Sequence, residues 1–550
     1  MILTFFLAAF VAIDARAQWS VPYTISPAQN STPQVAVDSE GNTVAVWIET
    51  IGELNVVQAA TLPVNGSWSA PTIISGRCSY CAEPKIVADP AGNAVAIWLN
   101  YEEFSKDRRS IWGYTVQSAK LPKNGSWTIP EVLSSQDDIP FNVSLAGDPS
   151  GNVAAVWDSF LPTNFAIRFQ IVASILPFGG EWSDAQVISP EADYYSFYPD
   201  VCIDLDSNIT AVWADYSDYL DPSLKYSQAK INGLWSVPQP IPMTIEGYPT
   251  SPFVDADAFG NVFASWLDFD SNENSMIMVS TLNKNGSWSQ PVVLEAPPNN
   301  LYQNNICSNF SNVVLITWKE YIRASSSYFF KASIYTDGVW SAPEVISDTY
   351  SLDVRNSPIS VAIDQLGNIV ATWNLRSIEF NKVQTVTHPY HGSWSKPLDI
   401  LNTSPEIAVS NPEIGISPKG RVICVWGTNI PVNSNLKFSL AAGEGQGVQG
   451  SNGNNLFPPL PATDLKGSVF KIKFLTQTDI VHQLTWSPSP DTSTRGYHIY
   501  KDGKLIKTIP ASGPFVFDVH RCKKQPKSRY IVAAYNDSGL DSLPITINLP

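Results

Sequence analysis

The sequence predicts an all-β protein made largely of one repeated unit, and three observations support this prediction. A tryptophan recurs nine residues after an aspartate, as in Asp38/Trp47 and Asp89/Trp98. A second tryptophan recurs in a G-x-W-S phrase. Charged residues make up only 15% of the chain, and 42 prolines with regular Gly and Asn turn signals separate short apolar runs. Such a composition is typical of β proteins.

Two tryptophan series set the period of the repeat. The nine-residue spacing returns, with Asn or Ser twice in place of Asp, as Asp148/Trp157, Asp204/Trp213, Asp257/Trp266, Asn309/Trp318, Asp364/Trp373 and Ser417/Trp426. The second series comprises Trp19, Trp68, Trp127, Trp182, Trp235, Trp288, Trp340 and Trp394. Because an indole buries a large apolar area, we interpret both series as packing between adjacent sheets.

Each repeat is predicted to form four short strands. In the first repeat they are Gln34–Val37, Thr43–Ile48, Val56–Leu62 and Trp68–Ser75. The first two are joined by D-x-x-G-N, in which an Asp side chain bonds the backbone two residues on and Gly accepts a positive φ. The last two are commonly joined by Asn-Gly, which is a strong hairpin signal.

The two ends of the array predict how it closes. Repeats of 51 to 59 residues with four strands each are typical of the blades of a β-propeller. A lone strand, Trp19–Ser26, precedes the first repeat, and the eighth repeat ends at Leu436–Leu440 without a fourth strand. The lone strand would complete that last sheet and leave no open end. We therefore expect an eight-bladed β-propeller over residues 18–441, closed by the N-terminal strand.

The regions outside the array have their own signatures. Residues 1–17 predict a signal peptide, because the apolar run Ile2–Ile13 is followed by Ala-Arg-Ala. The expected location is secreted, cell-surface or periplasmic, with no transmembrane segment. Residues 442–457 predict a Gly-rich linker, and residues 458–550 a separate domain.

The C-terminal domain resembles a fibronectin type III domain. The matching residues are Trp486 on the second strand, Tyr497-x-x-Tyr500 on the third, and Tyr530 at the position of the family's corner tyrosine. The phrase A-x-N-x-x-G at 534–539 also fits. The resemblance implies a β-sandwich that serves as a spacer or adhesive module.

The repeat itself is similar to propeller families. The phrase VAVD-x-x-GN resembles the propeller repeats of bacterial secreted and surface proteins, and GSWS is similar to phrases of sialidase-like propellers. The sialidase aspartate box, S-x-D-x-G-x-T-W, is absent, so the resemblance implies fold and not sialidase activity.

Charge and cysteines exclude some functions. A net charge of −16 argues against a nucleic-acid partner, because phosphate binding needs clustered Lys and Arg. Cys78 and Cys81 form a C-x-x-C without a second Cys or His pair. A local disulfide is therefore favoured over a zinc site or a redox motif.

The connections that vary between repeats predict the binding face. The distance from Asp to the next tryptophan is fixed at nine, whereas the connections after the second and fourth strands differ in length, as in binding loops. These connections supply acids and aromatic residues, which suit a glycan or a cationic peptide. The alternative is that the acids solvate strand ends and the aromatics pack the loops. The candidate ligand-binding residues are Glu49, Asp158, Asp215, Tyr216, Asp268, Phe269, Glu320, Tyr195 and Tyr198.

Metal and catalytic signals are weak. Asp268, Asp270 and Asn272 begin a D-x-D-x-N calcium pattern, but Glu273 stands where Gly should make the turn. No cofactor is expected, with calcium kept as an alternative. The array contains only His388 and His391, both in one turn away from the predicted binding face, which argues against a Ser-His-Asp site.

Three functions stay open. The first is an exported, non-catalytic binding or adhesion protein whose propeller loops take a protein or glycan at a cell surface. The second is a secreted carbohydrate-active hydrolase with paired carboxylates on the same face. The third is a structural envelope protein.

Overall fold

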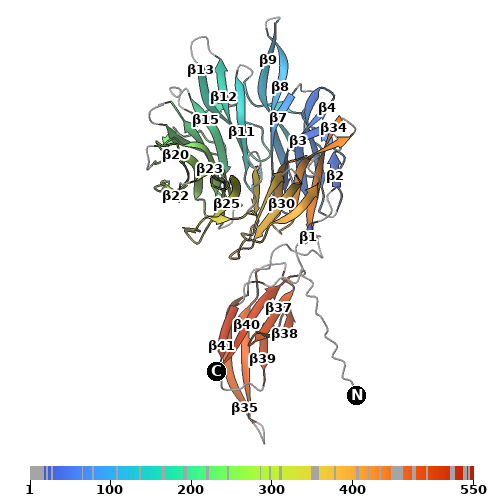
Figure 1. Ribbon diagram of the computed structural model, residues 1–550, viewed down its shortest axis with the longest axis vertical. Coiled ribbons are helices and arrows are strands. Elements are labelled where there is room, and N and C mark those ends of the chain that lie inside the picture. Colours follow the sequence, from blue (N-terminus) through green and yellow to red (C-terminus); the bar gives the residue numbers. More distant parts are fainter. Residues whose placement is uncertain are drawn as a thin grey trace. The chain divides into compact units, whose positions relative to one another are not determined.

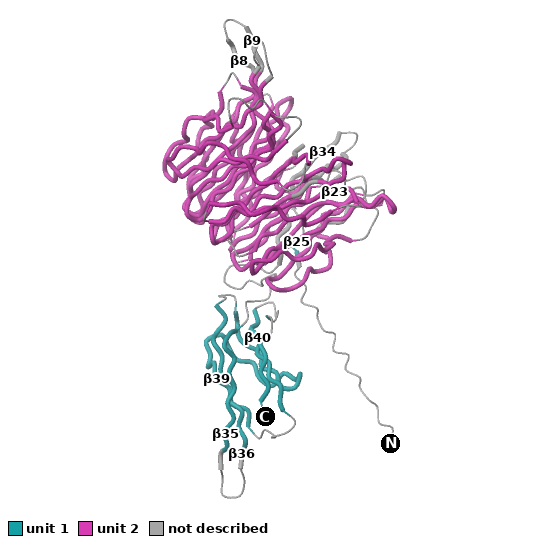
Figure 2. Tube along the Cα trace, turned by 90° about the vertical axis from the view of Figure 1, so that its left-hand side faces the viewer, with its two compact units in different colours: residues 1–20, 445–550 teal, residues 21–444 magenta. Residues whose placement is uncertain are grey.

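The computed structural model describes residues 18–19, 23–446 and 462–549, apart from short internal gaps of which 349–357 is the longest. Every element in this part of the chain is a β-strand (Figure 1). No helix long and apolar enough to cross a membrane occurs there. The chain forms two compact units, one of residues 21–444 and one that contains residues 445–550 (Figure 2). The all-β prediction is confirmed.

The larger unit consists of repeated antiparallel sheets of four or five strands. Sheet 1 has the order β3 (Gln29–Val37), β4 (Thr43–Ile51), β5 (Leu54–Leu62) and β6 (Thr72–Ile73). The described residues form seven further sheets of this kind. Sheet 2 contains β7 (Tyr80–Ala88), β8 (Ala94–Lys106), β9 (Arg109–Leu121) and β10 (Glu131–Val132). Sheet 3 contains β11 (Ile139–Gly147), β12 (Val153–Pro162), β13 (Ile167–Leu176) and β14 (Gln186–Val187). Sheet 4 contains β15 (Ser196–Ile203), β16 (Asn208–Asp215), β17 (Ser223–Lys230) and β18 (Gln239–Pro240). Sheet 5 contains β19 (Thr250–Ala256), β20 (Val262–Phe269), β21 (Ser275–Leu282) and β22 (Val292–Glu295). Sheet 6 contains β23 (Asn300–Ser308), β24 (Val314–Ile322), β25 (Ser327–Thr336), β26 (Val339–Trp340) and β27 (Glu344–Val345). Sheet 7 contains β28 (Ile359–Ile363), β29 (Ile369–Arg376), β30 (Asn381–His388) and β31 (Leu398–Thr403). Sheet 8 contains β32 (Ala408–Ile416), β33 (Val422–Val432), β34 (Asn435–Gln446), β1 (Gln18–Trp19) and β2 (Tyr23–Ser26).

The first strands of the sheets contact one another in chain order. β3 lies against β7, β7 against β11, and so on through β15, β19, β23, β28 and β32, which in turn lies against β3. β2 pairs with β34, where Tyr23 stands opposite Ala442. The first and last sheets are also joined by a hydrogen bond from Arg421 Nη1 to the carbonyl of Gly41, at 2.8 Å.

The first tryptophan series forms the core between sheets. All eight of these indoles have no exposed surface. Trp213 of β16 packs with Ile171 and Ala173 of β13 in sheet 3, and Trp47 packs with Ile423 and Val425 of sheet 8. The second series is half-buried, and its members other than Trp19 pack at the edge of the same clusters, as Trp235 does beside Trp213. The predicted role is confirmed for the first series and for the second series apart from Trp19.

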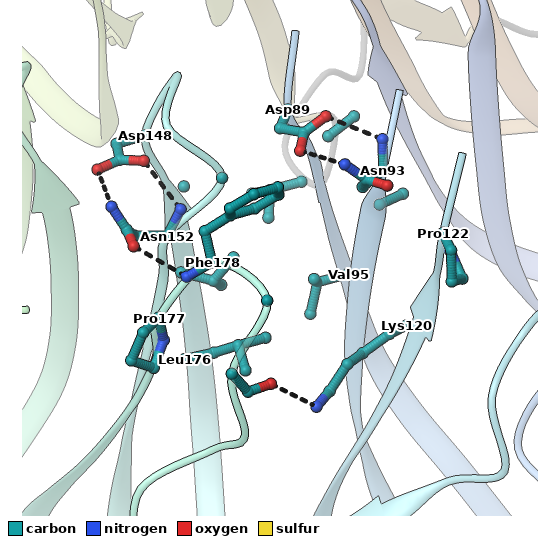
Figure 3. A pocket seen from close by; sticks show the side chains of 18 of the residues that line it. Asp89, Asn93, Val95, Lys120, Pro122, Asp148, Asn152, Leu176, Pro177 and Phe178 are labelled. Atoms are coloured by element: carbon teal, nitrogen blue, oxygen red, sulfur yellow. Dashed lines mark hydrogen bonds between the residues drawn. The ribbon is translucent and has the colours of Figure 1, made fainter. Parts of the chain in front are cut away.

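The D-x-x-G-N turn is a closed set of hydrogen bonds (Figure 3). Asp148 Oδ1 accepts from the Asn152 amide at 2.9 Å, and its Oδ2 accepts from Asn152 Nδ2 at 2.8 Å. Asn152 Oδ1 then accepts from the amide of Phe178, in the turn after β13, at 3.0 Å. One Asp–Asn pair therefore joins both turns of a sheet, which explains why Asn follows the glycine.

The same turns also join neighbouring sheets. A Cβ on Gly92 would lie 2.9 Å from Oδ2 of Asp38, one sheet earlier. Where Ser207 replaces the glycine, with φ 57°, its hydroxyl donates to Asp148 Oδ2 at 2.6 Å. The glycine position of D-x-x-G-N thus requires either glycine or a side chain that donates a hydrogen bond to the neighbouring aspartate, and the residue must also tolerate a positive φ. We call the end of the unit that holds these turns, such as Asp148–Asn152, the turn end. The opposite end, which holds the connections between the second and third strands, is the loop end.

The strands differ from their predicted lengths at both edges of a sheet. β3 begins at Gln29 instead of Gln34 because a bulge at Thr32, with φ 46°, carries the strand past Pro33. The predicted fourth strand shortens to Thr72–Ile73. Before it, Ser69 accepts through its hydroxyl from the Thr61 amide at 3.0 Å. That bond explains the serine in G-x-W-S.

Two half-buried aspartates join first strands of different sheets. Asp200 of β15 accepts from Ser144 Oγ of β11 at 2.6 Å and from the Val254 amide of β19 at 2.8 Å. Asp255 of β19 accepts from the Ser308 amide of β23 at 2.6 Å. Burial raises the pKa of both carboxyl groups, that of Asp255 to about 7, against the opposing effect of these hydrogen bonds.

The smaller unit has two antiparallel sheets in its described part. One has the order β35 (Thr463–Lys473), β36 (Thr478–Ser487), β39 (Val516–Val519). The other has the order β38 (Lys504–Pro510), β37 (Gly496–Lys501), β40 (Ser528–Tyr535), β41 (Ile545–Leu549). Trp486, Tyr497 and Tyr530 are buried between them.

The predicted linker and the predicted disulfide can be compared with the structure. Residues 442–446 were predicted as linker but continue strand β34, because the backbone pairs with β33 and β1 there. Cys81 is disulfide-bonded, and Cys78, its predicted partner, lies outside the described residues. The predicted signal peptide, residues 1–17, and the rest of the predicted linker, residues 447–457, also lie outside the described residues.

Candidate binding face

Four of the predicted acids lie at the loop end, but inside strands. Glu49, Asp215, Asp268 and Glu320 each follow a buried tryptophan by two residues, within β4, β16, β20 and β24. Side chains two apart on a strand share a side, so each acid lies beside its tryptophan and is buried. The prediction that they occupy exposed loops is wrong, because the strands run past the tryptophans.

Two of these carboxylates serve the indoles. Glu49 Oε2 accepts from Trp47 Nε1 at 2.9 Å and from Ser26 Oγ at 2.6 Å. Asp268 Oδ2 accepts from Trp266 Nε1 at 3.4 Å. Burial raises the pKa of Asp268, although hydrogen bonds to its carboxylate oppose the rise. These acids therefore satisfy buried N–H groups in the core.

The other two are paired with lysines. Asp215 contacts Lys225 Nζ and accepts from the Ser217 amide at 2.9 Å. Burial would raise the pKa of Asp215, but the Lys225 ammonium and the Ser217 bonds outweigh it and lower the pKa. Glu320 lies 3.3 Å from Lys331 Nζ and accepts from Asn299 Nδ2 at 2.6 Å.

Asp158 differs from the other acids. It follows Trp157 by one residue and so faces the other side of β12. Its Oδ2 accepts from Asn142 Nδ2 at 2.7 Å and from the Tyr198 amide at 3.2 Å, while Oδ1 is buried without a partner among the described residues. Burial raises the pKa of Asp158 to about 6. Asn142 and Tyr198 are the bulge residues of β11 and β15, with φ 45° and 55°.

Aromatic side chains form a continuous row across sheets 3 to 5 at the loop end. We call the row the aromatic row, and it consists of Phe160, Phe169, Tyr195, Phe197, Tyr198, Tyr216 and Tyr248. Phe169 lies 4.5 Å from Phe197 between ring centroids, and Phe197 lies 6.0 Å from Tyr216. Tyr216 stacks on Tyr248 at 4.8 Å with an interplanar angle of 10°.

The row presents part of its surface to solvent. Tyr195 and Tyr198 are each 44% exposed and Tyr248 is 40% exposed. Tyr216 is held in place by its hydroxyl, which donates to the Pro249 carbonyl at 2.9 Å. The structure thus brings together Tyr195, Tyr198 and Tyr216 of the predicted set, with Asp158 bonded to the Tyr198 amide. Phe269 lies apart, in the cluster between sheets 5 and 6.

The calcium pattern at Asp268–Asn272 builds a hairpin turn. Asp270 Oδ1 accepts from the amides of Asn272 and Asn274 at 2.8 and 2.9 Å, and Asn274 Nδ2 donates back to Asp270. Glu273 takes the positive φ of 62°. Asp268 meanwhile points to Trp266, so the three candidate ligands do not converge. Within the described chain, no group of three or more His, Cys, Asp or Glu could hold a metal ion.

Several members of this face were not predicted from the sequence. Phe169 lies near the start of the third strand of sheet 3 and faces Phe160 across the pair. Asn142 was not among the predicted site residues, although its side chain holds Asp158. Lys319 follows Trp318 as Asp158 follows Trp157, and burial lowers its pKa to about 8. A polar residue directly after the tryptophan of a buried strand was the available signal.

The sequence matches no protein-family model and no curated protein sequence. The fold is remotely similar to solved β-propeller structures. A polysaccharide lyase of family PL25, an ulvan lyase, is 8% identical, with a TM-score of 0.41 over 77% of this chain and 95% of its own. A Hadza microbial sialidase is 11% identical, with a TM-score of 0.37 over 78% and 96%. The Trypanosoma rangeli sialidase is 8% identical, with a TM-score of 0.35 over 87% and 89%.

Proposed function

We propose that this chain is an exported, non-catalytic binding protein whose aromatic row takes a glycan at a cell surface. Its larger unit is an eight-bladed β-propeller, and β2 completes the last blade. Pairing of β2 with β34 and the contact of β3 with β32 support this closure. The smaller unit is a fibronectin type III-like module, which its sheets of three and four strands support.

The aromatic row carries the proposal. Three exposed tyrosines, on one row of touching rings, offer flat apolar faces with hydroxyl groups at their edges. Sugar rings have an apolar face for such surfaces and hydroxyls for the polar groups beside it. Asp158 accepts a hydrogen bond from the Tyr198 amide, and its other oxygen is buried without a partner among the described residues. A protein partner is the alternative occupant of this face.

Hydrolysis by paired carboxylates is the less supported alternative. Glycoside hydrolysis needs one carboxyl group as acid and another as base or nucleophile, both facing the substrate. Here Glu49 and Asp268 bond indoles, and Asp215 is bonded to Lys225. Such carboxylates already have their partners in the fold, which favours a structural role.

A glycan array with the full chain tests the proposal. We expect binding to a subset of glycans, lost at least about tenfold when Tyr195, Tyr198 and Tyr248 are all replaced by alanine, because each removes a stacking surface. The matched control is Phe259→Ala, which removes a ring that is 60% exposed at the turn end. Equal binding by the triple variant would contradict the proposal, and so would a wild-type chain that binds no glycan.

A further inference from the structure

Two cavities lie between neighbouring sheets near the turn end. One, of about 280 Å³, lies between sheets 2 and 3 and is lined by Val87, Val95, Leu176 and Phe178 (Figure 3). The other, of about 340 Å³, lies between sheets 6 and 7 and is lined by Thr336, Trp340, His388 and Tyr390. Phe178 and Tyr390 occupy the same place in the repeat, directly after the proline of P-F-G-G-E-W and P-Y-H-G-S-W.

The polar groups of the first cavity are already satisfied. Asp89 and Asn93 bond each other at 2.6 Å, and Asp148 and Asn152 do so at 2.8 Å (Figure 3). Lys120 donates to Glu181 at 2.9 Å. The rest of its wall is mostly apolar, so the described side chains of this cavity offer no unpaired polar group to orient a ligand.

The second cavity has polar atoms without partners. Thr336 and His388 line this cavity, and the Thr336 hydroxyl and His388 Nδ1 are buried and make no hydrogen bond to another described residue. Burial lowers the pKa of His388, which favours its neutral imidazole. A neutral imidazole nitrogen and a hydroxyl can each accept or donate to a ligand hydroxyl.

Neighbouring residues hold the aromatic rings of Trp340 and Tyr390 in place. Trp340 packs on Tyr335 at 5.2 Å between centroids, and Tyr390 lies 3.9 Å from His391. The Tyr390 amide donates to Asn368 Oδ1 at 3.0 Å, which locks the turn that carries the ring. Gly367 leaves room for that ring, because a Cβ there would lie 2.8 Å from it. The aromatic walls are therefore preorganised.

We infer that this cavity is a second, independent binding site that takes one neutral sugar ring. Trp340 and Tyr390 provide apolar faces, and Thr336 and His388 provide unsatisfied polar atoms at the cavity wall. Glu344, an exposed carboxylate, lines the cavity and disfavours an acidic sugar.

Ligand-observed NMR with the full chain tests the inference. The probes are D-glucose, D-galactose, D-mannose and L-fucose, each up to about 100 mM, a range that covers millimolar affinities. We expect at least one to bind, and Thr336→Val to weaken it about fivefold, since the substitution keeps the shape but removes one hydrogen bond. Tyr390→Ala is expected to abolish the signal by removing a wall.

Two control variants show whether the sugar occupies this cavity or another part of the surface. Phe178→Ala alters the equivalent turn at the first cavity and should leave the affinity unchanged. Tyr248→Ala alters the aromatic row and should also leave it unchanged, so failure of the proposed function does not affect this result. The inference is overturned if none of the four sugars binds, or if Thr336→Val and Tyr390→Ala both bind as the wild type does.

Discussion

The turn end and the loop end of the same sheets differ in how their polar groups are used. At the turn end, the Asp–Asn pairs close their own hydrogen bonds, and some also contact the next sheet, as Asp148 does with Asn152 and Ser207. At the loop end, Asp158 keeps one oxygen without a partner among the described residues, and tyrosines beside it are partly exposed. The Asp–Asn pairs of the turn end thus have their partners within the fold, whereas the loop end exposes tyrosine rings.

The core between the two ends should give the largest effect. Trp213→Ala removes an indole with no exposed surface, and large-to-small core changes of this size cost about 3–5 kcal/mol. Trp235→Ala, which removes a half-buried indole of the same cluster, should cost less. Urea unfolding measures both, and an equal loss would contradict the assigned roles of the two tryptophan series.

The turn end should be sensitive to one methyl group. A Cβ at Gly151, where φ is 86°, would lie 2.6 Å from the Phe178 ring and 3.0 Å from Asp89 Oδ2. We expect Gly151→Ala to cost about 2–4 kcal/mol, from strain and overlap together. Gly179→Ala is the control, since φ is 69° but no atom lies within 4 Å. It should cost only about 1 kcal/mol in the same thermal melts.

Asp255 should make stability depend on pH. Its pKa is raised to about 7, chiefly by burial, so the native state holds a proton between about pH 4 and 7 that the unfolded chain has released. Stability therefore falls as pH rises through this window. Asp255→Asn should remove part of the fall, by about 1–3 kcal/mol between pH 5 and 8.

Thermal melts at several pH values measure this effect. Glu53→Gln is the control, because Glu53 is exposed in the turn between β4 and β5, and it should leave the slope unchanged. A wild-type slope in the Asp255→Asn variant would show that the carboxyl is not protonated in the fold.

The smallest effect is expected at the loop end. Burial raises the pKa of Asp158 to about 6, so its charge beside Tyr198 changes between about pH 5 and 7. If a glycan lies on the aromatic row, its affinity should change by about two- to threefold over this range, and Asp158→Asn should flatten the change. Binding curves at three pH values decide this, and an unaltered profile in the variant would remove Asp158 from the site.

The repeated part of the fold was predictable because its causes are local. The Asp38–Trp47 spacing and the Gly or Asn turn signals reflect hairpins, and hairpins depend on a few adjacent residues. Contacts between sheets left no such pattern. Asp200 bonds Ser144 and Val254 from two other sheets, and other repeats carry different residues at these positions, so no spacing reveals them.

The candidate site was predictable only in part, for a similar reason. The row of tyrosines could be expected from loop composition. The burial of Glu49 and Asp268 could not, because the predicted second strand ends at Ile48, directly after Trp47, whereas pairing continues to Ile51 in sheet 1 and to Phe269 in sheet 5. The strand's alternation, once extended by two residues, would have put both acids beside their indoles.

The shortness of the outermost strands has a consequence for aggregation. β6, β10 and β14 are only two residues long, and Ile73, Val132 and Val187 on them are about half exposed. A long apolar rim of this kind would recruit strands from other molecules. Here the serine hydroxyl of a W-S phrase occupies an amide of the neighbouring strand, as Ser69 does for Thr61. The rim can therefore stay apolar at high protein concentration without acting as a template for fibril growth.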